Sequence, residues 1–248
     1  MSAPAPPLAR VTGQARFELE TLLRNGEQLL VSVVLPLGAL LGLAFTQAPS
    51  LGAGRRIDVA VPGVLALCVI SVAFTSQAIA TGFDRRAAVL RLLGTTPLGR
   101  GGLLGAKAVA TLGVEVVQWV LVGGVGLALG WRPSATGLPY ALLLLLLGTW
   151  AFVALALLLA GTLRAEGVLA VANLLWVLLL VLGGVVVPRT ELPAAIAPVV
   201  GLLPSAALGD GLRDAFGSGI LSWAAVLVLV GWGSVATLLA ARAFRWSE

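Results

Sequence analysis

The sequence predicts an all-α integral membrane protein with six transmembrane helices. Two observations predict this fold. The 248 residues are 59% hydrophobic and only 11% charged, whereas a soluble domain usually carries about a quarter charged residues. The apolar residues also gather in runs long enough to cross a bilayer, which takes about 20 residues. Because the backbone must satisfy its own hydrogen bonds in hydrocarbon, such runs form helices.

Six apolar runs are the expected spans, and they cover residues 28–46, 59–82, 108–130, 138–163, 168–187 and 220–241. Six spans place both termini on one side of the membrane. Lys and Arg favour the cytoplasmic loops. A cytoplasmic N-terminus puts eleven of these residues inside and five outside. We therefore expect a multi-pass protein with both termini in the cytoplasm.

The segment before the first span has two parts. Residues 1–7 are rich in proline and are predicted to form a disordered tail. Residues 8–27 are predicted to form an amphipathic helix in the membrane interface, because apolar residues recur at helical spacing along one stripe. That stripe consists of Leu8, Val11, Ala15, Leu19 and Leu22. An ordinary solvated lead-in is the alternative.

The loop between the fifth and sixth spans, residues 188–217, is too polar and too broken by proline to cross the membrane, yet it keeps many apolar residues. We expect a re-entrant extracellular hairpin of two short helices, broken near Pro204. Because irregular backbone at membrane depth must be covered by protein, this hairpin should pack against the bundle.

Charge is concentrated in the loop between the second and third spans, "GFDRRAAVLRLLGTTPLGR" at residues 82–100. We predict one short amphipathic helix from Asp84 to Thr95, which Pro97 ends, with Asp84 near its positive N-terminal end. Positive-inside loop chemistry and attraction to anionic lipid explain the arginines. They do not explain exposed Val89, Leu90 and Leu93. An apolar stripe framed by charges favours docking into a groove on a partner protein.

Several classes of function are disfavoured by missing residue types. The chain has one cysteine (Cys68) and no histidine, which excludes an intrachain disulfide and disfavours metal sites and the usual nucleophile and acid–base arrangements of an intramembrane enzyme. The stretch "GGLLGAKA" at 101–108 departs from a phosphate-binding loop. An ATP-driven role would therefore need a separate subunit. The net charge of +5 reflects the Lys and Arg residues of the loops, which set the orientation in the membrane. It does not indicate nucleic-acid binding.

The chain resembles the permease subunits of type-2 ABC exporters, in the daunorubicin-resistance-like branch. The resemblance rests on the loop "FDRRAAVLRLLGTTPLGR", on the opening "LLRNGEQLLVSVVLPL" and on the late "LLPSAALGDGLRDAF", and it extends over essentially the whole chain. Many relatives have Gly-Thr where this sequence has Ala87 and Ala88, so the local fit of the loop to a partner can differ.

The resemblance implies a half-transporter without its motor. Two permeases would pair, and they would be either two copies of this chain or this chain and a sibling. Two ATP-binding subunits would dock beneath them and would hold ATP and Mg. This chain would bind no cofactor. The loop helix would be the coupling helix, and the 163–167 loop would add a smaller contact. The expected coupling residues are Asp84, Arg85, Arg86, Val89, Leu90, Leu93, Thr96, Pro97 and Arg100. We expect a bacterial inner membrane protein.

Polar residues inside the spans are candidates for a substrate cavity. Glu115 lies inside the third span, and an ionisable group there is costly unless it has a function. Lining a cavity and holding helices together are equally open roles for it. Gln118, Gln77 and Asn173 are weaker candidates, because interhelical hydrogen bonds are common in membranes.

Two functions are therefore compared. The first is the permease of an ATP-driven exporter for a hydrophobic or amphipathic compound, drug-like or lipid-like. The alternative is a stand-alone ion-coupled carrier, which would favour paired broken helices and several buried carboxylates. Glu115 is the one carboxylate clearly inside a span, and this favours the exporter.

Overall fold

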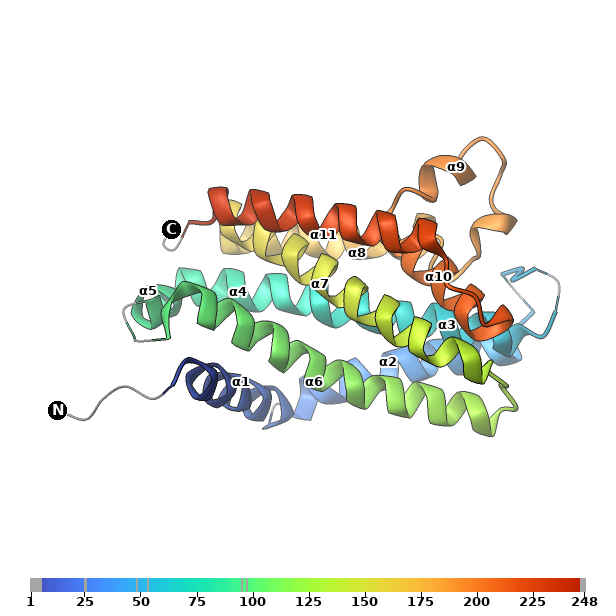
Figure 1. Ribbon diagram of the computed structural model, residues 1–248, viewed down its shortest axis with the longest axis horizontal. Helices are drawn as coiled ribbons and strands as arrows, with labels where there is room; N and C mark the ends of the chain where they lie inside the picture. The colour runs from blue at the N-terminus through green and yellow to red at the C-terminus, as the bar shows by residue number, and fades with distance from the viewer. Residues whose placement is uncertain are drawn as a thin grey trace.

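The computed structural model describes residues 6–24, 26–47, 49–52, 54–94, 96 and 98–245, and all regular structure in these residues is helical. Long helices run side by side along the long axis of the molecule (Figure 1). The helices long and apolar enough to cross a membrane are Arg56–Arg86, Gly105–Ala128, Ala135–Thr162, Ala165–Leu182 and Trp223–Ala243, and a shorter apolar helix covers Ser32–Phe45. The predicted class, an all-α membrane protein, is confirmed.

The helices follow one another along the chain with short connections. The first half holds α1 (Pro7–Arg24), α2 (Gly26–Phe45), α3 (Arg56–Val69), the π-helical η1 (Ile70–Ser76), α4 (Gln77–Arg86), α5 (Val89–Gly94) and α6 (Gly99–Ala128). The second half holds η2 (Ala135–Gly137), α7 (Leu138–Thr162), α8 (Ala165–Leu182), η3 (Arg189–Glu191), α9 (Ala197–Val200), α10 (Pro204–Ser218) and α11 (Trp223–Ala243). The first predicted span coincides with α2. Of the predicted tail at residues 1–7, the first five residues lie outside the described part.

The two ends of the bundle differ. One end of the bundle holds the start of α1, the whole of α5 and the end of α11 (Figure 1). Helices α9 and α10 lie toward the other end. We call these the α5 end and the α9 end. The chain therefore returns to the end from which it starts, as expected for an even number of crossings.

The centre of the bundle is the continuous helix formed by α3, η1 and α4. Its apolar stretch is 83% buried inside the bundle. Large buried side chains such as Ile70, Leu144 and Phe152 fill the core around it. Helix α10 also belongs to this core, because it packs against α3, α7 and α11 and buries Leu208 and Leu212 completely. It begins with Pro204, which suits the first turn of a helix.

Helix α1 packs along the first half of α6. Two glycines of α6 make room for its apolar stripe. A Cβ atom on Gly113 would lie 3.0 Å from Leu19, and one on Gly102 would lie 3.6 Å from Val11. Ala15 on the same stripe is buried. The stripe predicted from the sequence therefore faces a neighbouring helix along much of its length.

Candidate functional site

The charged loop folds differently from its prediction. Residues Asp84 to Arg86 form the last turn of α4, and α5 begins only at Val89. Ala88, between the two helices, has φ of +58°, a left-handed conformation in which a helix of L-residues cannot continue. The prediction of one helix from Asp84 to Thr95 is therefore wrong, because the second span continues through Arg86.

Asp84 takes part in an ionic cluster between helices. Its Oδ2 lies 2.8 Å from Nζ of Lys107 on α6, and the same Nζ lies 3.3 Å from Oε2 of Glu18 on α1. The Lys107 side chain is only 5% exposed. Asp84 therefore does not sit at the N-terminus of a coupling helix as predicted. It joins α4 to α6, and through Lys107 to α1.

Arg85 and Arg86 hold the turn between α7 and α8. The buried Arg85 guanidinium donates to the carbonyl oxygen of Leu163. Arg86 pairs with the exposed carboxylate of Glu166, in the first turn of α8. The charges of the 84–86 segment are thus engaged within the chain. The 163–167 loop, predicted as a second contact with a partner, touches this segment.

Helix α5 exposes a different apolar set from the one expected. Leu90 is 1% exposed, so the prediction that it faces a partner is wrong, because its side chain points into the chain's own core. Val89 is 38% and Leu92 is 69% exposed. Thr96 is partly buried. Pro97 and the side chains of Leu93 and Arg100 lie outside the described part, and their coupling role stays a prediction.

Three of the four polar candidates inside the spans make contacts between helices. Glu115 is buried and accepts a hydrogen bond of 2.5 Å from Thr149 on α7. Gln118 donates to the Ser32 carbonyl oxygen on α2 at 2.6 Å. Gln77 accepts a hydrogen bond of 3.2 Å from Thr111 on α6. These side chains connect the helices of the bundle.

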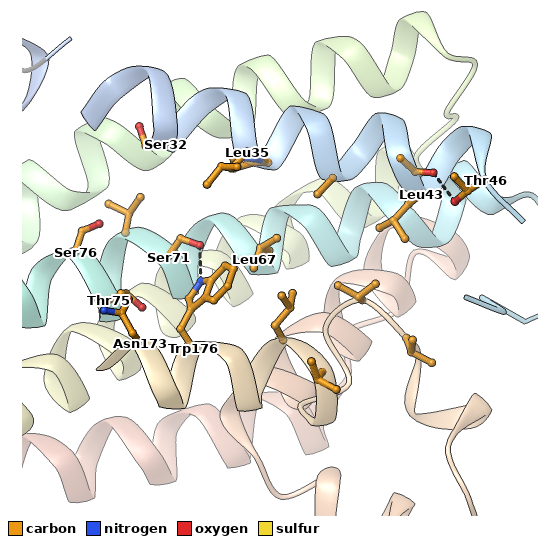
Figure 2. Close-up of a pocket in the computed structure, with 18 residues that line it drawn as sticks. Ser32, Leu35, Leu43, Thr46, Leu67, Ser71, Thr75, Ser76, Asn173 and Trp176 are labelled. Atoms are coloured by element: carbon orange, nitrogen blue, oxygen red, sulfur yellow. Dashed lines mark hydrogen bonds between the residues drawn. The ribbon is translucent and has the colours of Figure 1, made fainter. Parts of the chain in front are cut away.

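A cavity of about 870 Å³ opens between α2, η1 and α8, and Asn173 is the fourth candidate and lines it (Figure 2). Glu115, Gln118 and Gln77 are not among its lining residues. The lining residues are Ser32, Leu35, Pro36, Ala39, Gly42, Leu43, Thr46, Leu67, Ser71, Val72, Thr75, Ser76, Asn173, Trp176, Leu180, Val181, Val186 and Val187. No charged side chain is among them.

The polar side chains of the cavity are not evenly spread. Ser32, Ser76, Thr75 and Asn173 gather toward one end, whereas Leu43 and Thr46 lie toward the other (Figure 2). The first group lies nearer the α5 end, because α2 runs from the middle of the bundle toward the α9 end, and α4, which follows η1, runs toward the α5 end (Figure 1). The wall toward the α9 end is mainly apolar. The cavity is therefore amphipathic along the long axis of the bundle.

The π-helical segment η1 supplies much of the polar wall. Ser71, Val72, Thr75 and Ser76 all belong to it and all line the cavity. The Trp176 indole on α8 donates to the Ser71 hydroxyl at 2.9 Å and ties the two walls together. The Oγ1 atom of Thr75 is buried without a hydrogen-bond partner in the described structure. Single-turn π-helices are rare and are often found at functional sites.

The wall toward the α9 end is anchored by α10. Arg213 donates to the carbonyl oxygens of Gly184, at 3.0 Å, and of Val185, just before Val186 and Val187 reach the cavity. Asp210 lies 3.0 Å from Arg213. Burial lowers the pKa of the Arg213 guanidinium, and Asp210 opposes this shift. The guanidinium thus fixes the irregular segment that closes this side of the cavity.

Comparison with known proteins gives the family. A model of the ABC-2 type transporter family matches residues 15–216, from α1 through α10. This chain belongs to that family. A search of curated proteins finds no match. The membership confirms the type-2 ABC permease predicted from the loop and its flanking motifs, and the daunorubicin-resistance-like branch stays a prediction.

As an ABC-2 type permease, the chain is the membrane component of an ABC-type exporter. It is a transport subunit and is not catalytic by itself. The family implies an ATP-binding partner. The sequence did not reveal the cavity of this permease, because its lining residues come from helices far apart in the chain, and small polar residues such as Ser32 and Thr75 are ordinary within apolar helices.

Proposed function

We propose that this permease moves a hydrophobic or amphipathic compound, drug-like or lipid-like, out of the cell with energy from ATP hydrolysed on a separate subunit. The cavity between α2, η1 and α8 carries the proposal. Its volume of about 870 Å³ lies within the usual range of roughly 300–1,000 Å³ for sites that bind drug-sized ligands. Its walls belong to membrane-crossing helices, so a compound in it would lie within the bilayer.

The lining narrows the chemistry of the substrate. A charged group buried without a counter-charge is costly, and no charged side chain is found among the described residues that line the cavity. The hydroxyls of Thr75 and Ser76 and the Asn173 amide instead offer hydrogen bonds at one end. We therefore propose an uncharged amphiphile, with its hydrogen-bonding group toward the α5 end and its apolar part toward the α9 end.

The proposed assembly contains two permeases, either two copies of this chain or this chain with a sibling, and two ATP-binding subunits. The α5 end would face the cytoplasm of a bacterial cell, and both termini with it. Val89 and Leu92 on α5 would dock onto the ATP-binding subunit, since their exposure in a charged loop is otherwise unfavourable. ATP and Mg would bind the partner, and this chain would bind no cofactor.

Filling the cavity tests the proposal. Ala39 lines the cavity from α2, so Ala39→Trp should block uptake of a fluorescent uncharged amphiphile into inside-out proteoliposomes that contain both subunits when ATP is added to the outer medium. The matched control is Leu41→Trp, on the same helix but outside the lining and 42% exposed. It should transport at the unmodified rate. ATP hydrolysis should persist in both variants, since neither lies near α5.

Equal transport by the two variants would contradict the cavity assignment. Transport that needs an ion gradient but no ATP-binding subunit would contradict the exporter and favour the stand-alone carrier.

A further inference from the structure

Glu115 is a fully buried carboxyl group in the interior of α6. Its Oε2 accepts the hydrogen bond from Thr149 on α7. The Cys68 thiol on α3 lies close enough to interact electrostatically with a charge on Glu115. No Lys or Arg pairs with it among the described residues. Lys107, about two turns earlier on the same helix, is held by Asp84 and Glu18. Glu115 therefore has no counter-charge in the part of the chain that the structure describes.

Two buried oxygen atoms at this place have no hydrogen-bond partner among the described residues. They are Oε1 of Glu115 and Oε1 of Gln118. Residues three positions apart on a helix are neighbours on one face. An ionised carboxylate and an amide oxygen are both acceptors, so they cannot satisfy each other. A protonated carboxyl group, in contrast, carries an O–H that can donate to the amide oxygen.

The ionised form would be costly here. A buried carboxylate without a cation loses far more solvation energy than a neutral polar group, and inside a membrane this cost is expected to be large. One proton removes the charge and supplies the missing hydrogen bond to both oxygen atoms. The neutral acid thus accounts for the burial of Glu115 and for both unpartnered atoms.

We propose that Glu115 is a proton-binding site, which takes its proton from solvent and donates it in a hydrogen bond from Oε1 to Oε1 of Gln118. The Nε2 of Gln118 donates to the Ser32 carbonyl oxygen on α2, and Ser32 lines the cavity. The proton therefore completes a chain of hydrogen bonds from α7 through α6 to α2. This role goes beyond export and does not depend on the identity of the substrate.

Proton occupancy sets how firmly α2 is held. With the proton bound, Gln118 is fixed on both sides and α2 keeps its place in the cavity wall. When Glu115 ionises at alkaline pH, the two oxygen atoms repel each other and this support is lost. The stabilisation is thus complete at lower pH and disappears as pH rises past the release of the proton.

Infrared difference spectroscopy of the purified full-length chain in nanodiscs tests the protonation state directly. At neutral pH we expect a C=O stretching band of a protonated carboxyl group that is absent from Glu115→Gln. The control Glu166→Gln removes an exposed carboxylate and should leave that band unchanged. If Glu115→Gln instead removes only carboxylate bands, Glu115 is ionised and the proposal is overturned.

Thermal unfolding supplies a second test. Glu115→Gln should keep the neutral-pH melting temperature, because its amide can donate to Gln118 as the acid does, whereas Glu115→Ala should melt lower. The melting temperature of the unmodified chain should fall at alkaline pH more steeply than that of Glu115→Gln. Equal losses in the Gln and Ala variants, or identical alkaline profiles of Glu115→Gln and the unmodified chain, would overturn the proposal.

Discussion

Lys107 holds three helices together through one ammonium group. It is buried and lies close to Asp84 on α4 and Glu18 on α1. Lys107→Met would leave two carboxylates facing each other without a cation. Removing one partner of such a buried pair costs about 3 kcal/mol. We expect a clearly lower melting temperature in detergent for this variant.

A matched surface pair provides the control for Lys107. Arg16 and Glu20 on α1 lie 2.8 Å apart, but the Arg16 side chain is 82% exposed. Exposed ion pairs contribute little, so Arg16→Met should melt like the unmodified chain. Equal effects of the two substitutions would show that burial of Lys107 does not strengthen its ion pairs.

Single residues also show how far the sequence could be interpreted. It identified Glu115, Gln118 and Gln77 as unusual, because polar groups inside spans are costly. It could not decide whether they line a cavity or join helices, because that depends on which helix lies opposite. Leu90 illustrates the same difficulty. A leucine in a charged loop was expected to be exposed, but the break at Ala88 turns it inward.

At the scale of elements, α3 and the 183–187 segment approach each other so closely that only glycine fits. A Cβ atom on Gly63 would lie 2.5 Å from the Val185 carbonyl oxygen and 3.1 Å from the Arg213 guanidinium. Gly63→Ala should therefore displace the segment that closes the cavity. Overpacking of this kind costs about 1–3 kcal/mol, which should appear as a lower melting temperature.

Gly124 on α6 is the matched control for Gly63. It also lies inside a membrane-crossing helix, but a Cβ atom there would meet nothing within 4 Å. Alanine favours a helix more than glycine does, so Gly124→Ala should melt at the same temperature or higher. A loss as large as that of Gly63→Ala would show that the close approach is not responsible.

Elements differed in how well the sequence predicted them. The long spans were predictable. A run of about twenty apolar residues in a membrane must satisfy its own backbone hydrogen bonds, and an α-helix does this within the run. The π-helical η1 could not be predicted from the sequence, because its residues are of types that are equally common in an α-helix and no residue type marks the change in hydrogen bonding. The boundary between α4 and α5 was missed for a similar reason, since Ala87 and Ala88 favour an uninterrupted helix.

In the whole molecule, the exposed face of α5 and the cavity lie at different depths of the bundle. Helix α5 lies at the end where α1 begins and α11 ends (Figure 1), whereas the cavity lies along α2, η1 and the second half of α8. The continuous helix of α3, η1 and α4 connects the two, because α4 leads directly to α5. Motion imposed on α5 would therefore reach the cavity wall through η1.

Docking of a separate ATP-binding subunit on α5 can be measured by co-purification. The chain would be co-expressed with its candidate ATP-binding subunit and extracted in detergent, alongside Leu92→Asp on the exposed face of α5 and Leu127→Asn as a control on an exposed part of α6 remote from α5. We expect the unmodified chain and the control to retain the subunit, and we expect Leu92→Asp to lose it while remaining folded. A folded unmodified chain that retains no ATP-binding subunit, or a Leu92→Asp variant that retains it fully, would show that no such subunit docks on α5.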